Sequence, residues 1–369
     1  ESSKQCETGV SVMKVAVFTG TRAEYGLLYP LMLKLKASEA FELQLIVSGM
    51  HLSPRFGETW RTIEADGFSI DAKVEMLLSS DTSCGVAKSM GIGILGFADA
   101  LDRLQPDYLV ILGDRYEALA IAQAAAVMRI PIAHLHGGEV TEGAYDDSIR
   151  HAITKLSHLH FVACEEYRRR VIQLGEQPES VWNVGALGLE NIRSVPRVPL
   201  EVINQQLGLN LSRPFVLMTY HPVTAADEDA KETFGNLLSV LSRLEGYDLL
   251  FTYPNSDNGG HELIGMIEAF VARQETRAWA VPSLGLARYL SAVEECEVVV
   301  GNSSSGIIEV PSLGTPAVNI GVRQKGRLSA DSVIHVGTEE VDLQAGIERA
   351  LTEEAKNRAR SATNPYGDG

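Results

Sequence analysis

The sequence predicts an α/β protein made of two Rossmann-like, doubly wound domains with parallel sheets. Two features predict this fold class. Runs of β-branched residues repeatedly lead into glycine-rich turns and then into segments with helical spacing, which implies parallel strands joined by right-handed crossovers. This pattern is interrupted at residues 185–199, which contain two prolines, and then begins again. We therefore expect a first domain at residues 13–187 and a second at residues 188–369, after a non-native or disordered extension at residues 1–12.

Each domain shows several strands that end in polar or glycine-rich turns. In the first domain we expect strands at residues 14–20, 41–49, 106–113 and 130–136, and helices at residues 21–38, 85–104, 116–129 and 148–161. In the second domain we expect strands at residues 214–222, 247–255, 277–285, 298–301 and 315–321, with helices between most of them. Ligands of such sheets bind at the carboxyl ends of the strands, and we expect those ends of both domains to face one central cleft.

Composition and charge argue against several classes of protein. The 369 residues are 45% hydrophobic and 22% charged, a balance typical of soluble globular proteins. The longest uncharged runs, at residues 214–226 and 310–322, contain prolines and are shorter than the roughly 18 residues that a membrane-spanning helix needs. A formal net charge of −16 argues against a nucleic-acid partner. The four cysteines are far apart, which predicts free thiols and a cytoplasmic protein.

The strongest signal for a bound phosphate is the segment GNSSSG at residues 301–306. Asn302, Ser303 and Ser304 follow the end of a buried strand, at the start of an expected helix. Unpaired backbone N–H groups at a helix start, together with serine hydroxyls, favour an anion. Glu309 lies about one turn further on, where it can accept hydrogen bonds from ribose hydroxyls. An ordinary cap on a buried helix is the alternative, but three successive serines between glycines favour phosphate.

Other polar residues also lie next to strand ends. Arg22 follows the first strand, and an arginine at a helix start is easier to explain beside an anionic ligand, because the helix dipole favours negative charge there. Asp114 and Arg115 end another strand, although Asp114 can equally be a plain helix cap. Arg323 belongs to a basic loop after the last strand, for which a solvated loop is the alternative. His221 directly follows a strand, a position that suits a structural and a catalytic histidine equally.

The segment HLHGGEVTEGAYDDSIRH, at residues 134–151, gathers histidines and carboxylates. His134 and His136 would point the same way in a strand and could share a metal, but no third ligand follows at a characteristic spacing. Glu139 and Asp146 lie in a loop after a strand, where acid/base residues are often mounted, although an aspartate there can also cap the next helix. We therefore expect acid/base chemistry, with no metal and no other cofactor.

Taken together, these segments resemble the hydrolysing UDP-N-acetylglucosamine 2-epimerases, in the bacterial branch that serves sialic or legionaminic acid synthesis. The shared pieces appear in the same order over residues 14–369 and read GTRAEYG, GDRYEALA, GGEV…DDSIRHAITKLSH, HPVT, GNSSSG, GTP…NIGVRQKGR and NPYGDG. The resemblance implies the two-domain GT-B architecture. It also implies conversion of UDP-N-acetylglucosamine to UDP and N-acetylmannosamine, by elimination to a 2-acetamidoglucal and subsequent hydration.

The resemblance also implies roles for individual residues. The positions that match family residues needed for catalysis are Asp114, Asp146 and His221. The positions that match family residues holding UDP are Arg22, Arg115, Ser303, Ser304, Glu309 and Arg323. One position departs from the pattern: other members carry a catalytic glutamate where this chain has His136. Either His136 or Glu139, three residues on, takes that role.

Substrate and assembly remain open at this stage. UDP-N,N'-diacetylbacillosamine competes with UDP-N-acetylglucosamine as the substrate, and a GT-B glycosyltransferase or a UDP-sugar-binding regulator without turnover is a further alternative. The resemblance implies a homodimer or homotetramer, and we expect no nucleic-acid or membrane partner. In the family a last helix crosses back onto the first domain. NPYGDG is where that closing helix would begin, so we expect it to be truncated here.

Overall fold

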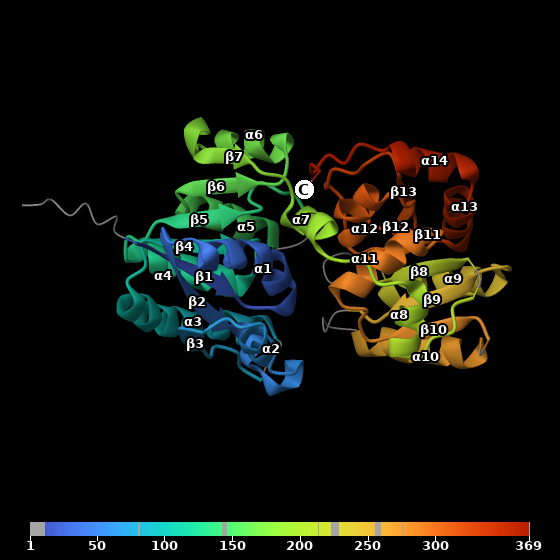
Figure 1. The fold of residues 1–369 in the computed structure, drawn as a ribbon, viewed down its shortest axis with the longest axis horizontal. Coiled ribbons are helices and arrows are strands. Elements are labelled where there is room, and N and C mark those ends of the chain that lie inside the picture. Colours follow the sequence, from blue (N-terminus) through green and yellow to red (C-terminus); the bar gives the residue numbers. More distant parts are fainter. Residues whose placement is uncertain are drawn as a thin grey trace, which may run out of the picture. The chain divides into compact units, whose positions relative to one another are not determined.

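A computed structural model of the protein describes residues 12–79, 82–141, 146–212, 214–222, 229–254, 260–274 and 276–368. These residues form two compact units (Figure 1). Unit 1 contains the described residues of Glu1–Glu139 and Asp146–Val184, and unit 2 contains those of Val140–Tyr145 and Gly185–Gly369. Each unit is an α/β domain with one parallel sheet, which confirms the predicted fold class. The extension expected at residues 1–12 lies outside the described residues, except for Val12.

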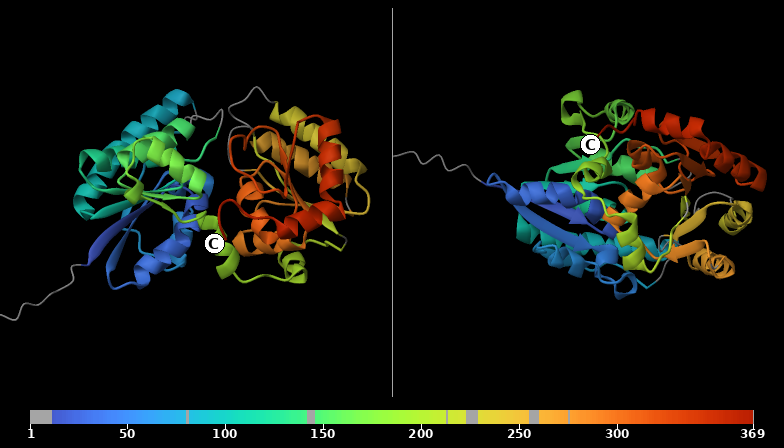
Figure 2. Two further views of the ribbon diagram at one scale, coloured as in Figure 1. Left: turned by 90° about the horizontal axis from the view of Figure 1, so that it is seen from above. Right: turned by 45° about the vertical axis from the view of Figure 1, so that its right-hand side comes forward.

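Unit 1 is built on a seven-stranded parallel sheet in the order β3-β2-β1-β4-β5-β6-β7. Its strands are β1 (Met13–Thr19), β2 (Phe41–Ser48), β3 (Ala72–Val74), β4 (Tyr108–Leu112), β5 (Ile132–Leu135), β6 (Leu159–Val162) and β7 (Val181–Asn183). Its helices are α1 (Arg22–Ala37), α2 (Trp60–Ala65), α3 (Ser83–Leu104), α4 (Tyr116–Val127), α5 (Asp146–Leu156) and α6 (Glu165–Gln173), with short 3-10 turns η1 (Gly49–Leu52), η2 (Pro54–Phe56) and η3 (Pro178–Ser180). Helices cover both faces of the sheet (Figure 2).

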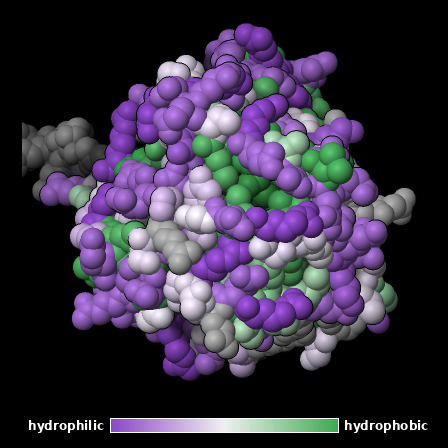
Figure 3. Space-filling model, turned by 90° about the vertical axis from the view of Figure 1, so that its right-hand side faces the viewer, coloured by the Kyte–Doolittle hydropathy of each residue, from purple (hydrophilic) through white to green (hydrophobic). Residues whose placement is uncertain are grey.

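Unit 2 is built on a six-stranded parallel sheet in the order β10-β9-β8-β11-β12-β13. Its strands are β8 (Phe215–Thr219), β9 (Asp248–Thr252), β10 (Ala278–Val281), β11 (Val298–Gly301), β12 (Ala317–Ile320) and β13 (Val333–Val336). Its helices are α7 (Leu187–Ser194), α8 (Leu200–Leu207), α9 (Ala230–Arg243), α10 (Gly260–Arg273), α11 (Leu286–Glu295), α12 (Ser305–Ile308), α13 (Glu340–Ala350) and α14 (Glu353–Ser361), with the 3-10 turn η4 (Val310–Leu313). The face seen in Figure 3 is mostly hydrophilic, with several smaller apolar patches.

The core of unit 1 explains why so many alanines follow β4. Ala118, Ala120, Ala122 and Ala125 of α4 are completely buried. A helix that is apolar on all sides belongs inside a domain, and α4 packs against α3, α5 and the sheet. Small side chains let α4 approach its neighbours closely, so the residue that opens it, just after β4, is held in a fixed position.

The strand order places a topological switch point in each sheet. In unit 1 the order reverses between β1 and β4, and in unit 2 between β8 and β11. Connections leave these two neighbouring strands toward opposite faces, so their carboxyl ends frame a crevice in which ligands of this fold class bind. The segments after β1, β4, β8 and β11 are the ones in which the sequence predicts functional residues.

Several expectations about single elements are wrong. The helix expected at residues 148–161 ends at Leu156, because the apolar residues that follow form β6 inside the sheet. The connection at residues 185–199 contains helix α7. The helix expected after GNSSSG is the four-residue α12, which passes into a 3-10 turn where Pro311 has no N–H to donate. Strands β3, β7 and β13 have three or four residues each, too few to show an alternating pattern.

Gly301 is required where β11 enters the GNSSSG segment. Its φ is +149°, and a Cβ atom there would lie 1.9 Å from the carbonyl oxygen of Thr219 in β8. No side chain can be accommodated at that distance unless β8 or β11 moves. The close pairing of β11 with β8 at this point therefore depends on the glycine.

We predict that Gly301→Ala lowers the free energy of unfolding of unit 2 by about 3 kcal/mol or more, because backbone strain adds to a clash with the neighbouring strand. Urea denaturation followed by circular dichroism measures the loss. Gly265→Ala in α10 is the matched control: nothing lies within 4 Å of its Cβ position, and alanine favours the helix. Equal stability of the two variants would contradict the prediction.

Candidate active site

In unit 1 the buried side chain of Arg150 connects groups from separate parts of the sequence. Its side chain is 1% exposed, and Nη2 forms an ion pair with Asp114 Oδ2. Nη1 donates to Asp147 Oδ1 (3.1 Å) and to the carbonyl oxygen of Glu139 (2.8 Å). A guanidinium spreads five N–H donors over a rigid planar fork and can bind acceptors in different directions, whereas the three donors of a lysine ammonium lie on one atom. Arg150 therefore fixes Asp114, at the end of β4, against the first turn of α5.

Asp146 lies in the same first turn of α5, four residues before Arg150. Carboxylates are favourable there, because the helix dipole places partial positive charge at its N-terminus. The sequence predicts a cap at this point, whereas both aspartates of the pair are helical residues. Asp114 and Asp146 thus come to the same region of unit 1. Asp114 is bound by Arg150 of α5, and Asp146 is itself part of α5.

His136 and Glu139 form a second polar pair in unit 1. His136 Nδ1 lies 2.8 Å from Glu139 Oε1, and the two side chains are 12% and 4% exposed. The backbone of His136 has a φ of +63°, a left-handed conformation that costs a residue with a Cβ about 1–2 kcal/mol. Strain of this kind persists where the surroundings force it, and it is concentrated at functional sites.

His134 is a structural histidine, and the two histidines of HLH do not form a metal-binding pair. Strand β5 ends at Leu135, so His136 is no longer part of the alternating strand that would align it with His134. His134 Nε2 bonds to the carbonyl of Gly113 (2.8 Å), and its Nδ1 lies 3.2 Å from Thr154 Oγ1. Burial lowers the pKa of His134 to about 3, so the ring is neutral. Over the described ranges, no cluster of three or more His, Cys, Asp or Glu side chains is arranged to hold a metal ion.

Two buried carboxylates, those of Glu24 and Glu117, lie beside the guanidinium of Arg115. Arg115 binds Glu117 in a bidentate contact through one edge of its guanidinium, with Nε–Oε2 and Nη2–Oε1 distances of 3.1 Å. The carboxylate of Glu24 accepts the backbone N–H groups of Gly20 (2.7 Å) and Thr21 (3.0 Å). Burial, reinforced by Glu117, raises the pKa of Glu24 to about 7.

This cluster bears on the predicted anion site after β1. In the capping box at the start of α1, the Glu24 carboxylate accepts the N–H groups of Gly20 and Thr21, and Thr21 Oγ1 accepts the N–H of Glu24. Arg22 is the first residue of α1 and is exposed. A role in holding UDP stays a prediction for both Arg22 and Arg115.

In unit 2 the buried side chain of Asn302 clamps the backbone of His221. Asn302 Oδ1 accepts the N–H of His221 (2.7 Å), and Nδ2 donates to the carbonyl of the same residue (2.8 Å). The carbonyl oxygen of Asn302 accepts Nη1 of Arg323 (3.0 Å) and Nε2 of Gln324 (2.9 Å). Burial, together with the charge of Arg323, lowers the pKa of His221 to about 3. His221 is therefore a neutral imidazole at the pH of the cell. One of its ring nitrogens can take up a proton, and the other can donate one.

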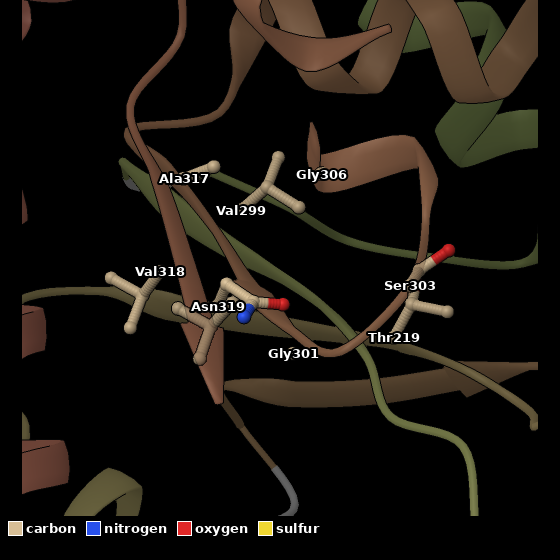
Figure 4. A pocket seen from close by; sticks show the side chains of 9 residues that line it. Thr219, Val299, Gly301, Ser303, Gly306, Ala317, Val318 and Asn319 are labelled. Atoms are coloured by element: carbon tan, nitrogen blue, oxygen red, sulfur yellow. The ribbon is translucent and has the colours of Figure 1, made fainter. Parts of the chain in front are cut away.

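The GNSSSG segment borders a narrow pocket at the carboxyl ends of the central strands of unit 2. Ser303, Gly301 and Gly306 line it together with residues of β8, β11 and β12 (Figure 4). Ser304 lies at the N-cap of α12 and Glu309 at its C-cap. The amide of Asn319 also lines the pocket, and its Oδ1 has no hydrogen-bond partner among the described residues. Valine and alanine side chains make up much of the lining, and the hydroxyls of Thr219 and Ser303 and the amide of Asn319 add polar groups to it. A role of this pocket in binding phosphate or ribose stays a prediction.

Comparison with known proteins identifies the family. The family model of the UDP-N-acetylglucosamine 2-epimerases matches residues 33–369. This chain belongs to that family.

Two curated relatives of this epimerase are similar over nearly their whole length. The GDP/UDP-N,N'-diacetylbacillosamine 2-epimerase (hydrolyzing) of Campylobacter jejuni is 39% identical over 347 residues, which cover 94% of this chain and 90% of that protein. The UDP-N,N'-diacetylbacillosamine 2-epimerase (hydrolyzing) of Legionella pneumophila is 36% identical over 359 residues, which cover 97% and 93%.

A solved structure shows the same fold. The UDP-N-acetylglucosamine 2-epimerase of Neisseria meningitidis, determined with UDP-GlcNAc bound, matches with a TM-score of 0.81 at 17% identity and covers 97% of this epimerase and 96% of that chain. Such structures have the GT-B architecture, as the sequence predicts.

Sequence reasoning misses the residues of this epimerase that hold others in place. Arg150 lies between Ile149 and Ile153 on the buried face of α5, and a cation at such a position is a signal that a buried acid accompanies it. Asn302 directly follows β11, as caps and clamps often do, but its partner is 81 residues away. His134 gives no signal beyond its place in a buried strand.

We predict that His134 makes the epimerase lose stability in acid. The folded state binds a proton at His134 only near pH 3, whereas the unfolded chain binds one near pH 6.5. Below pH 6.5 the unfolded state holds more protons, so stability falls as the pH falls. Between pH 7 and pH 5 the wild type should lose about 2 kcal/mol more than His134→Gln, measured by urea denaturation. Thr154→Val, which keeps the imidazole, should retain the wild-type pH dependence. Identical pH dependence in wild type and His134→Gln would refute the assignment.

Proposed function

We propose that this protein is a hydrolysing UDP-sugar 2-epimerase, which releases UDP and a 2-epimerised 2-acetamido sugar. Family membership supports the reaction class. The observation that carries the proposal is the cluster in unit 1, where Arg150 holds Asp114 and the loop that carries His136 and Glu139 at the carboxyl ends of the strands. A protein that only binds a UDP-sugar has no need for a buried cation that fixes acid/base groups in this way.

The chemistry explains why such a site needs several proton carriers. The hydrogen on C2 of the sugar is barely acidic, because its neighbours do not stabilise a carbanion. Once the C1–O bond to UDP breaks, C1 gains oxocarbenium character and the C2 proton can leave, which gives a 2-acetamidoglucal. Water then adds to C1 while a proton returns to C2 from the other face. Each half of the reaction needs a base and an acid in place.

We assign the residues as follows. Asp114, Asp146 and His221 exchange protons with the sugar or with water, and either His136 or Glu139 completes the set. Arg22, Arg115, Ser303, Ser304, Glu309 and Arg323 hold UDP. Two features of unit 2 support these roles: the small pocket that Ser303 lines together with Thr219 and Asn319, and the hydrogen bond from Arg323 to Asn302, the residue that clamps His221. Donors already in place for a diphosphate favour its departure.

Two substrates fit the proposed reaction. The sequence leads first to UDP-N-acetylglucosamine, and the solved relative with UDP-GlcNAc bound agrees with that choice. Two relatives, at 39% and 36% identity, are named for N,N'-diacetylbacillosamine, whereas one at 37% identity is named for polysialic acid biosynthesis. The sugars differ at C4 and C6, so rates on both must be compared directly.

The test is proton and phosphorus NMR with each UDP-sugar in D2O without added metal. We expect free UDP and a manno-configured sugar deuterated at C2, with the faster substrate naming the pathway. Asp114→Asn should lower kcat by about 10²–10⁴-fold, whereas Asp331→Asn in the exposed turn before β13 should not change it. Sugars that bind but stay intact would count against the epimerase reaction, and a fully active Asp114→Asn would remove Asp114 from the machinery.

We further propose that the enzyme is cytoplasmic and forms homo-oligomers through α3. By length and composition this helix could cross a membrane, but one side of it packs against α4 and β3 of the domain. Its outer face exposes Ile92 (40%) and Leu95 (72%). Lys88 lies four residues before Ile92, and Asp99 lies four residues after Leu95. In an antiparallel pair of α3 helices each leucine would meet an isoleucine and each lysine an aspartate, as a two-fold interface requires.

We predict that Leu95→Glu dissociates this oligomer, because a carboxylate would be buried against the isoleucine of the other helix at the centre of the interface. Light scattering after size-exclusion chromatography should show a multiple of the chain mass for the wild type and a single chain for the variant. Val341→Glu on α13, where the side chain is 78% exposed, is the matched control. A monomeric wild type, or an unchanged mass for Leu95→Glu, would contradict the proposal.

A further inference from the structure

The HGGE loop after β5 is built to hold one imidazole against one carboxylate. The N–H of His136 donates to the carbonyl of Phe161 at 2.9 Å, which anchors the residue to β6. Gly138 has a φ of +78°, and a Cβ there would lie 2.5 Å from the carbonyl oxygen of Tyr167. The far end of the loop is tied down because Arg150 binds the carbonyl of Glu139. The backbone thus turns sharply enough for the side chains of residues three apart to meet.

The contact assigns different tasks to its two members. Glu139 is 4% exposed, and its Oε1 atom is 2.8 Å from His136 Nδ1. If Nδ1–H donates to this carboxylate, the lone pair of the neutral ring is on Nε2, at the opposite side of the ring. A carboxylate that orients a histidine in this way also stabilises the imidazolium that forms when Nε2 takes up a proton.

We propose that His136 is the catalytic base of the elimination and that Glu139 is its positioning residue, an inference that rests on the proposed function. His136 Nε2 takes the proton from C2 of the sugar. The electron pair of the C2–H bond becomes the C1=C2 double bond, and the pair of the C1–O bond leaves with UDP. Where the family pattern has a glutamate that acts directly, this chain would use a dyad: the imidazole of His136, held by the buried carboxylate of Glu139.

Other ionisable groups lie near the dyad, and their charges also influence the protonation of the His136 ring. They come from β4, β5, α5, α6 and the turn before α6, and they are Asp114, His134, Asp147, Arg150, Arg170 and Cys164. Arg150 is already neutralised by Asp114 and Asp147, and Arg170 donates to the carbonyl of Gly138 (2.5 Å). Glu139 Oε1 lies 2.8 Å from His136 Nδ1, so the charge of Glu139 acts on the ring at contact distance.

The first test reads the tautomer of His136 by ¹⁵N NMR of the full chain, without substrate. We expect the neutral ring to carry its proton on Nδ1 in the wild type. In Glu139→Gln, an amide that can also donate to Nδ1 should shift the population toward the Nε2–H form. A wild-type ring protonated on Nε2 would overturn the proposal, whether or not the protein turns over a sugar.

The second test is kinetic. His136→Asn keeps a residue that tolerates the left-handed backbone and can still donate to Glu139, but it has no Nε2. We expect kcat to fall by about 10²–10⁴-fold, and deuterium incorporation at C2 to fall with it. Glu139→Gln should lose about 10–100-fold in kcat with little change in KM, and the acid limb of its pH profile should move to lower pH, because the carboxylate no longer favours the imidazolium. Glu165→Gln on the exposed surface of α6 is the control and should behave as wild type.

Opposite results would assign the chemistry to Glu139. If Glu139→Gln abolishes C2 deuteration while His136→Asn keeps activity within tenfold of wild type, the glutamate itself is the base and the dyad is refuted. Urea midpoints close to that of wild type establish that both variants fold. A wild type that releases UDP from neither sugar counts against the proposed function instead, and the tautomer measurement still decides whether the dyad exists.

Discussion

The buried guanidinium of Arg150 is the contact on which the candidate site of unit 1 depends. It joins the end of β4, the loop after β5 and the first turn of α5 through Asp114, the carbonyl of Glu139 and Asp147. Removing one partner of such a buried ion pair costs about 3–5 kcal/mol, because a charge is left without compensation. The geometry of the acidic groups is therefore coupled to the folding of the unit.

In unit 2 a neutral side chain, that of Asn302, connects distant segments in the corresponding way. The amide of Asn302 holds both backbone polar groups of His221, and the Asn302 carbonyl receives Arg323 and Gln324. In both units the central residue is almost completely buried and binds groups from segments distant in the sequence. Residues of this kind explain how a loop that follows a strand keeps its conformation.

Charge is distributed so that an acidic protein can accept an acidic ligand. The chain carries a formal charge of −16, yet buried carboxylates such as Glu24 and Glu117 are matched by Arg115 and by helix N–H groups. His134 and His221 are neutral because burial opposes their protonation. The polar residues in the GNSSSG pocket are uncharged, so a diphosphate there would meet hydroxyls and amides, with Arg323 supplying positive charge beside them.

The sequence by itself determined the fold class, the positions of the long strands and the polar residues at their ends, because these follow from local periodicity and turn chemistry. The family could also be read from it. Only the tertiary structure decided how those residues are used: that Arg150 pairs with Asp114, 36 residues earlier, and that Glu139 faces His136 across a left-handed turn. Such contacts depend on the packing of elements distant in sequence and on single backbone angles, and neither leaves a periodic trace in the order of the amino acids.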